Sequence, residues 1–176
     1  MTAQIGVPAI AAGTWTVSDG RTRVTFSVGN LGRRAHGSVA LGWGEVRVDA
    51  AGAPVRVRAE LDLNGLDTGI ARRDADLRKP RFLDVDRHPT MRWEADRFTR
   101  TDDGRWAAHG ELHVRGTSAP LTVVGAPEAA DLEGQWVRVR ACATLDRTAV
   151  GIRAPSFVIG RTVEIAIDAW LCPAVP

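Results

Sequence analysis

The chain contains little of several residue types, and each shortage excludes a class of protein. Its two cysteines, Cys142 and Cys172, are too few for a disulfide-rich scaffold and lack the spacing of a metal site. Lys79 is the single lysine among 23 basic residues, and the formal net charge is only +2. No block of like charge exceeds a pair such as Arg33-Arg34, so the sequence predicts no nucleic-acid binding.

Long hydrophobic runs are also missing. No window approaches the roughly 20 apolar residues that a membrane-spanning helix needs. Residues 1–13 lack the basic region of a signal peptide, and Gly6 and Pro8 interrupt their short apolar run. We therefore expect a protein without a membrane span that is located in the cytoplasm, with its two thiols reduced rather than joined.

Motifs for catalysis are missing as well. There is no Gly-x-Ser-x-Gly elbow and no phosphate-binding loop, and no motif assigns a partner to His36 or His88. His109 and His113 lie on one predicted strand, roughly 13 Å apart, which is too far to share a metal ion. Their parity also directs them outward. The sequence therefore predicts no catalytic residue, no metal site and no cofactor.

What the chain does contain is alternation of apolar and polar residues with a period of two. In residues 22–28, Val24, Phe26 and Val28 share one face, and the same pattern runs through 55–63 and 91–96. Further alternating runs occupy residues 13–18, 35–49, 105–115, 119–125, 136–147 and 161–171. This pattern predicts eight or nine strands in one antiparallel barrel. We place this single domain at residues 13–172, after a flexible N-terminal tail at residues 1–12.

One segment, residues 67–89, breaks the alternation. Residues from about Ile70 to Arg78 favour a helix that ends before Pro80, and Leu77 and Phe82 supply apolar contacts nearby. A short helical insert that closes one mouth of the barrel is therefore predicted. It acts either as a plug for an open end or as a lid over a ligand.

The charged residues of this insert allow two interpretations. Arg73, Asp74 and Asp84 form either a polar collar that orients a ligand head group or a network that holds the insert on the barrel. Because half-buried charges need partners, we favour the structural network.

Several motifs together resemble one known family. They are Phe26-Ser-Val-Gly-Asn30, Asp67-Thr-Gly, Arg73-Asp74-Ala-Asp-Leu77, Phe82-Leu-Asp84-Val, His88-Pro89-Thr-Met, Gly110-Glu-Leu-His-Val-Arg-Gly116-Thr-Ser-Ala-Pro120-Leu and Asp146-Arg147-Thr-Ala-Val-Gly151-Ile. In this order, from Gly13 to Trp170, the chain resembles the YceI-like family, the lipocalin-like polyisoprenoid-binding proteins. Asn30 and Asp76 depart from the family pattern, in which histidine is common at the first position and histidine or a similar residue is frequent at the second.

The resemblance implies an all-β fold, an eight-stranded antiparallel lipocalin-like barrel that holds a long apolar ligand. Eight strands enclose an interior that side chains can fill or that can hold one small ligand, so the size of the inward residues decides. The small inward residues that favour an open lumen are Ala59, Ala95, Ala108, Gly110, Ala141, Ala143 and Ala169. The large residues of the same parity that would fill it are Trp15, Trp43, Trp93 and Trp106.

The inward parity also predicts the wall of a binding site. The predicted ligand-binding residues are Phe26, Val28, Val57, Leu61, Leu63, Trp93, Leu112, Val114, Val139 and Phe157, with Leu77 and Phe82 at the mouth. For each of them a place in a packed core without ligand contact is the competing interpretation.

Two functions follow from this wall, from different classes. The first is a protein that sequesters or carries an isoprenoid or another apolar small molecule, with no chemistry of its own. The second is a cofactor-free cyclase or isomerase that uses the same apolar pocket. Inward polar side chains distinguish the two, because an acid or base catalyst needs at least one. A filled barrel that acts only as an interaction module is a third alternative.

A surface feature predicts a partner. If residues 136–147 and 161–171 form a hairpin, Trp136, Trp170 and Cys172 lie near one another on the outward face. Exposed tryptophans that cluster in this way are typical of interfaces, so we predict a homodimer.

Overall fold

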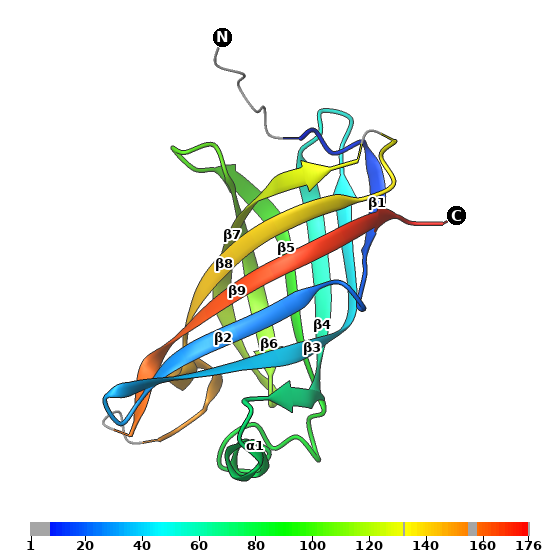
Figure 1. Cartoon of the computed structure of the whole chain (residues 1–176). Coiled ribbons are helices and arrows are strands. Elements are labelled where there is room, and N and C mark those ends of the chain that lie inside the picture. Colours follow the sequence, from blue (N-terminus) through cyan, green and yellow to red (C-terminus); the bar gives the residue numbers. More distant parts are fainter. Residues whose placement is uncertain (1–7, 132, 155–157, 176) are drawn as a thin grey trace.

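The computed structural model describes residues 8–131, 133–154 and 158–175 and consists mainly of antiparallel strands (Figure 1). Each strand combines apolar lumen-facing positions with more polar outward ones, as the alternation predicts. In chain order the elements are β1 (Gly13–Val17), β2 (Arg23–Asn30), β3 (Arg33–Val48), β4 (Pro54–Asp67), α1 (Ala71–Leu77), β5 (Thr90–Arg100), β6 (Trp106–Val114), β7 (Thr117–Ala130), β8 (Val137–Asp146), the 3-10 turn η1 (Arg147–Val150) and β9 (Ile159–Pro173).

The strands close into a ring because β4 pairs back to β3. The order around the ring is β3, β2, β9, β8, β7, β6, β5, β4. β1 and β2 occupy one position in this ring, since both pair with β3 and β9: Trp15 of β1 lies opposite Val46, and Phe26 of β2 lies opposite Gly37. Nine strands therefore form a barrel of eight positions, and the predicted all-β barrel is confirmed.

Buried apolar residues form two clusters, one at each end of the barrel. The larger one lies at the end where α1 is found and consists of Leu63, Leu83, Val85, Leu112, Val114, Ala119, Leu121, Ala143, Leu145 and Val150. The smaller one, at the opposite end, consists of Trp15, Val48, Val137 and Leu171. We call the barrel end with the larger cluster the α1 end. The opposite end is the hairpin end, named after the β5–β6 hairpin that turns there.

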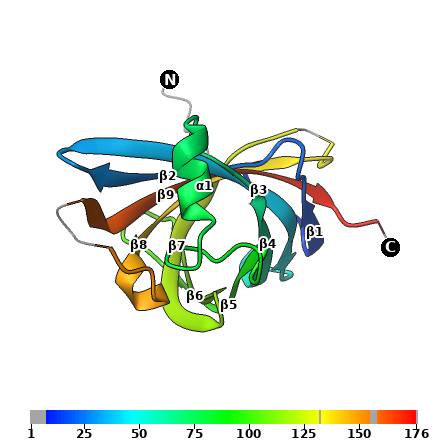
Figure 2. The same ribbon diagram turned by 90° about the horizontal axis from the view of Figure 1, so that it is seen from below.

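The insert crosses the α1 end of the barrel (Figure 2). The helix is short, as predicted, and Ile70 is its N-cap and Arg78 its C-cap. None of the helical residues is buried; the chain that follows the helix enters the barrel end, where Leu83 is 7% and Val85 1% exposed. Among the residues described, no helix is long and apolar enough to cross a membrane.

A β-bulge in β3 changes the parity of that strand. The register of β3 on β4 shifts between Leu41 and Trp43, and as a result Trp43 faces outward with 43% of its surface exposed, beneath the guanidinium of Arg58 at 5.4 Å. The prediction that Trp43 points inward was therefore wrong. A bulge inserts an extra residue, so every side chain beyond it moves to the opposite face.

The beginning of the described chain contacts the hairpin end. Ile10 packs against the smaller cluster, and the indole Nε1 of Trp15 donates a hydrogen bond to the carbonyl of Ala11 at 2.9 Å. These residues belong to the segment that the sequence predicts as a flexible tail.

Candidate functional site

The lumen of the barrel contains a cavity of about 550 Å³. This volume lies in the range of about 300–1,000 Å³ that is typical of small-molecule sites. The lining runs from Leu77 and Phe82 at the α1 end to Arg100 and Gly104 at the hairpin end, so the cavity extends along the barrel axis.

Most of the residues predicted to form the wall of the binding site line the cavity. Ten of the twelve predicted residues line it: Phe26, Val28, Val57, Leu61, Leu63, Leu77, Phe82, Trp93, Leu112 and Val139. Val114 does not line it. Its side chain is 2% exposed and packs in the larger cluster, because Val114 ends β6 at the tight turn to β7. Phe157 lies outside the described residues.

Trp93 lies flat against the inner wall and does not fill the lumen. Its Nε1 donates a hydrogen bond to the carbonyl of Leu121 on β7, so the indole crosses β6 to reach an acceptor at 3.0 Å. The ring passes over Gly110, where a Cβ would lie only 2.7 Å from the indole atoms Cε2 and Nε1. Gly110 therefore holds a ring and adds no empty volume, contrary to the prediction.

Phe26 also packs its ring against a glycine of the neighbouring strand. A Cβ on Gly37, opposite Phe26 on β3, would lie 2.5 Å from its ring atom Cζ. The phenyl ring thus covers a glycine of the neighbouring strand, an arrangement that stabilises sheets. Both aromatic rings contribute apolar surface while they leave the centre of the barrel empty.

Most of the alanines predicted to face the lumen do so. Ala59, Ala108, Ala141, Ala143 and Ala169 line the cavity. Ala95 is buried at 4% exposure but does not line it. Among the predicted tryptophans, Trp106 joins Trp93 in the lining, and Trp15 belongs to the smaller cluster.

The lining also includes residues that sequence reasoning missed. A bulge between Ala95 and Arg97 shifts the register of β5 on β6, and beyond it Phe98 and Arg100 face the lumen. Alternation continued without a bulge would place Arg97 inward. The sequence contains one sign of this bulge: the apolar Phe98 is out of phase with the alternation that includes Trp93.

The charged part of the lining has one sign. Within the described residues, Arg58, Arg100 and Arg147 line the cavity, and no carboxylate, histidine, lysine or cysteine does so. The described lining thus offers no carboxylate or imidazole as a general acid or base, which a cyclase or isomerase with acid–base chemistry would need.

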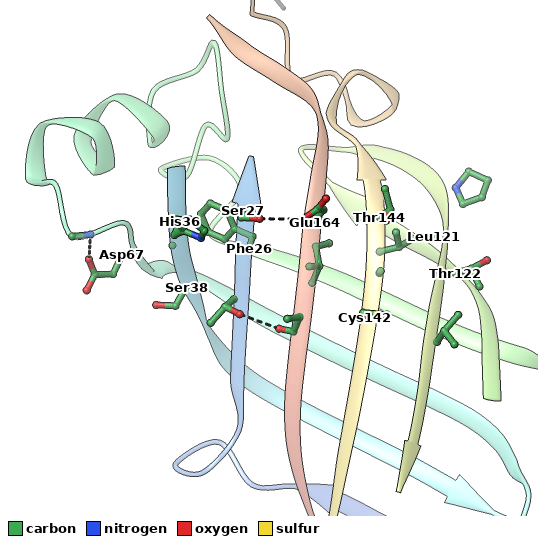
Figure 3. A pocket seen from close by; sticks show the side chains of 18 residues that line it. Phe26, Ser27, His36, Ser38, Asp67, Leu121, Thr122, Cys142, Thr144 and Glu164 are labelled. Atoms are coloured by element: carbon green, nitrogen blue, oxygen red, sulfur yellow. Dashed lines mark hydrogen bonds between the residues drawn. The ribbon is translucent and has the colours of Figure 1, made fainter. Parts of the chain in front are cut away.

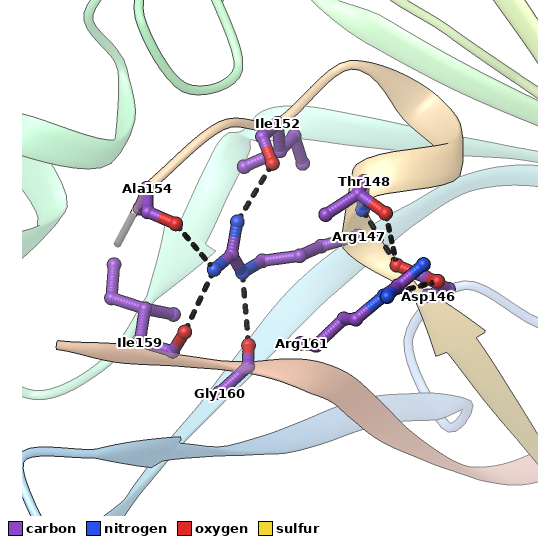
Figure 4. Close-up of polar contacts among 8 residues, drawn as sticks. All are labelled: Asp146, Arg147, Thr148, Ile152, Ala154, Ile159, Gly160 and Arg161. Atoms are coloured by element: carbon purple, nitrogen blue, oxygen red, sulfur yellow. Dashed lines mark hydrogen bonds and ion pairs between the residues drawn. The ribbon is translucent and has the colours of Figure 1, made fainter. Parts of the chain in front are cut away.

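Arg147 is a buried cation that backbone carbonyls surround (Figure 4). Its side chain is 2% exposed and donates to the carbonyls of Gly160, Ile152, Ala154 and Ile159, all at 2.8–2.9 Å. Four acceptors for five N–H donors nearly satisfy the guanidinium. Arg147 therefore fixes the chain after η1 against the start of β9.

The charged residues of the insert contact other residues of the insert. The Nε of Arg73 donates to the hydroxyl of Thr68 at 2.9 Å, and the carboxylate of Asp74 accepts from the Thr68 backbone N–H at 3.0 Å. Asp84 contributes through its backbone: it has a φ of +50°, and its carbonyl accepts from the N–H of His88. None of the three lines the cavity, which argues against a polar collar. The hydrogen bonds given above lie within residues 67–89, so a network that holds the insert on the barrel stays a prediction.

Asp76, which departs from the family pattern, also lies outside the cavity lining. Its carboxylate accepts a hydrogen bond from Lys79 at 2.6 Å, and that bond lowers the pKa of Asp76 below its ordinary value.

The histidines of β6 face outward as predicted. His109 contacts Thr99 at 2.8 Å, and His113 contacts Ser118 at 2.7 Å. The described residues contain no group of three or more His, Cys, Asp or Glu side chains that would hold a metal ion.

A second hollow of about 1240 Å³ lies on the outward face of the sheet (Figure 3). Thr25 and Ser27 of β2 line it, and they alternate with the lumen residues Val24 and Phe26. Its other polar lining comes from His36, Ser38, Asp67, Thr122, Cys142, Thr144 and Glu164. We assign the candidate site to the lumen, because strands enclose it on all sides and its lining is apolar.

The aromatic pair on the outer face forms as predicted but is partly covered. The ring centroids of Trp136 and Trp170 are 4.9 Å apart, and both side chains are half-buried. The guanidinium of Arg21 lies 3.7 Å from the centroid of Trp170. The homodimer stays a prediction, and its support is reduced because Arg21 already covers part of the aromatic surface.

The fold and the cavity together define a class, the lipocalin-like antiparallel barrels with an apolar lumen. The sequence model of the YceI-like domain matches residues 15–171, nearly the whole barrel. The chain therefore belongs to the YceI-like family. Among curated proteins, none matches this sequence.

Solved structures share this fold. BcnA of Burkholderia cenocepacia has a TM-score of 0.78 at 12% identity, over 88% of this chain and 98% of its own. A polyisoprenoid binding domain from Saccharophagus degradans, implicated in plant cell wall breakdown, has a TM-score of 0.67 at 10% identity, over 91% and 98%. The YceI protein of Campylobacter jejuni has a TM-score of 0.67 at 13% identity, over 79% and 82%.

Proposed function

We propose that this protein binds a long apolar ligand, a polyisoprenoid or a similar lipid, in the lumen and sequesters or carries it. One observation carries the proposal: a continuous cavity of about 550 Å³ with an almost entirely apolar lining. Family membership and the structural likeness to a polyisoprenoid binding domain support it.

The wall supplies affinity mainly through desolvation. Each buried methylene contributes about 0.8 kcal/mol, less the cost of ordering a flexible chain. Because the described wall offers few hydrogen-bonding groups to the ligand chain, selectivity depends on length and shape. Leu77 and Phe82 would contact the ligand end nearest α1, and Trp93 and Phe26 would flank its middle.

The side chains of the lumen favour a ligand carrier over an enzyme. An apolar lumen lets a ligand enter and leave unchanged, whereas proton transfer requires a positioned acid or base. The three arginines of the described lining are cations at physiological pH and do not exchange protons there. Binding is therefore the function that the lining favours.

Extraction of the ligand tests the proposal. The protein is purified from its native host, denatured and extracted, and the extract is analysed by mass spectrometry. We expect a stoichiometric long-chain lipid from wild type. A lumen that stays empty and also fails to bind added polyisoprenoid alcohol would overturn the proposal.

Two matched variants locate the ligand. Ala169 and Ala166 both lie on β9, but Ala169 lines the lumen and Ala166 lies on the exposed outer face. We expect Ala169→Phe to lose most of the bound lipid and Ala166→Phe to keep it, with circular dichroism to confirm that both variants are folded. Equal lipid content in two folded variants would place the ligand elsewhere.

A further inference from the structure

The lumen has an imbalance of charge. Its described lining includes three arginines, Arg58, Arg100 and Arg147, and no acidic side chain. Arg58 alternates with the lumen residues Val57 and Ala59, and its guanidinium lies over the outward-facing Trp43. A cation in an apolar cavity is stabilised by an anion or by several hydrogen-bond acceptors. The three arginines differ in how many such partners they have within the described chain.

Two of the three arginines are already engaged. Arg147 donates to four backbone carbonyls. Arg58 forms an ion pair with Glu45, with an Nη2–Oε1 distance of 3.0 Å. Arg147 therefore has an acceptor for nearly every donor. The charge of Arg58 is already paired with Glu45, although its Nε is buried without a hydrogen-bond partner among the described residues.

Arg100 differs from both. Within the described chain it forms no ion pair, and its one side-chain hydrogen bond goes from Nη1 to the carbonyl of Gly104. Its guanidinium stacks on Trp106, 4.1 Å from the ring centroid, which orients the group while most of its N–H donors remain available. The same turn contains two acidic residues: Asp103 pairs with Arg105 at 2.7 Å, and Asp102 is exposed and forms no ion pair with Arg100 within the described chain.

The fold places Arg100 at one end of the lumen. It is the last residue of β5, opposite Trp106, the first of β6, and both line the cavity. The bulge between Ala95 and Arg97 is what turns Arg100 inward. The other end of the lumen is closed by the apolar Leu77, Phe82 and Leu83.

We propose that the ligand is an acidic amphiphile, with a carboxylate or phosphate head group bound by Arg100 at the hairpin end and its apolar chain directed toward α1. This inference rests on the proposed function and adds to it the chemical class and the direction of the ligand. A planar guanidinium donates two parallel hydrogen bonds to either head group, and these are stronger when both partners are charged.

The test compares two probes that differ only in the head group. Farnesyl phosphate and farnesol are titrated into the delipidated protein, with tryptophan fluorescence and calorimetry as readouts. Wild type should bind the phosphate about tenfold more tightly than the alcohol, in keeping with one charged hydrogen-bonded contact at a partly exposed site. That preference should fall at high salt, because the contact is between charges.

Two variants of β5 locate the effect. Arg100→Gln should remove the preference for the phosphate over the alcohol. Arg97→Gln is the matched control, because Arg97 lies on the same strand, is exposed and does not line the cavity; it should keep the preference. Equal affinity of wild type for the two probes, or a preference that survives Arg100→Gln, would overturn the proposal while lumen binding stands.

Inorganic phosphate alone separates a lipid head group from a free anion. It should neither raise the melting temperature nor displace farnesol. An increase in melting temperature that requires Arg100 would assign the site to a free anion and overturn the proposal. Failure of both farnesyl probes and of longer prenyl alcohols to bind would reject the proposed function itself, and this inference with it.

Discussion

The two ends of the barrel differ in how they are closed. At the α1 end, the insert and η1 cover the strands, Val85 and Val150 are at most 1% exposed, and Arg147 has nearly all of its donors satisfied. At the hairpin end the buried cluster is smaller, and Arg100 lies exposed on Trp106. The α1 end is therefore the more completely packed of the two, whereas Arg100 at the hairpin end retains hydrogen-bond donors without partners among the described residues.

Among the substitutions that test this difference between the ends, the largest loss of stability is expected at Arg147. Arg147→Met leaves four backbone carbonyls without their buried donor and should lower the free energy of unfolding by about 4 kcal/mol, measured by urea denaturation. Arg161→Met is the control, since Arg161 pairs with Asp146 in an exposed ion pair, which contributes little to stability. Similar losses in the two variants would contradict the assigned role of Arg147.

The same substitution at both ends sharpens the comparison. Leu63 at the α1 end is 0% exposed and Leu171 at the hairpin end is 2% exposed. Leu63→Ala should cost about 3 kcal/mol of unfolding free energy and Leu171→Ala about 2 kcal/mol, because the larger cluster loses more contacts. Chemical denaturation of both variants checks the order, and a greater loss at Leu171 would reverse our assignment of the more stable end.

A smaller loss of stability is expected in the middle of the barrel, where the ring of Trp93 covers Gly110. Gly110→Ala puts a methyl group against the indole and the carbonyl of Glu94, and should lower stability by about 2 kcal/mol. Gly20→Ala is the control because no atom lies within 4 Å of its added Cβ. The melting temperatures of both variants test this, and an unchanged value for Gly110→Ala would mean that the ring does not rest on the strand.

The smallest effect concerns an ion pair on the outer face near the hairpin end. Arg138 donates two hydrogen bonds to Asp168 at 2.7 and 2.6 Å, and they lower the pKa of Asp168 below its ordinary value. The pair therefore stabilises the fold above the ordinary pKa of about 3.9, and this contribution is lost as the pH falls through the lowered pKa.

Asp168→Asn measures that contribution. The variant should be less stable than wild type by about 1 kcal/mol or less near pH 7, because the pair is partly exposed. The difference should shrink as the pH falls below about 4. Denaturation curves from pH 3 to 7 provide the comparison, and a difference that stays constant with pH would show that the charge of Asp168 is not responsible.

The sequence predicted much of the lumen because alternation and a closed antiparallel sheet translate directly into faces. Val57, Leu61 and Leu63 line the cavity since β4 keeps its period of two between them. Trp43 was misplaced and Arg100 was missed, because bulges in β3 and β5 shift the period. A bulge depends on the register between two strands, which the residues of one strand do not specify.

By itself the sequence determined the all-β class, the family, the short insert and the apolar character of the inner wall, since these follow from local pattern and motif order. Only the tertiary structure decided that the lumen is open. Trp93 can lie flat because Gly110, on the neighbouring strand, offers the space and Leu121 offers the acceptor. Such a fit joins residues far apart in the chain, and it exists only once the strands have paired.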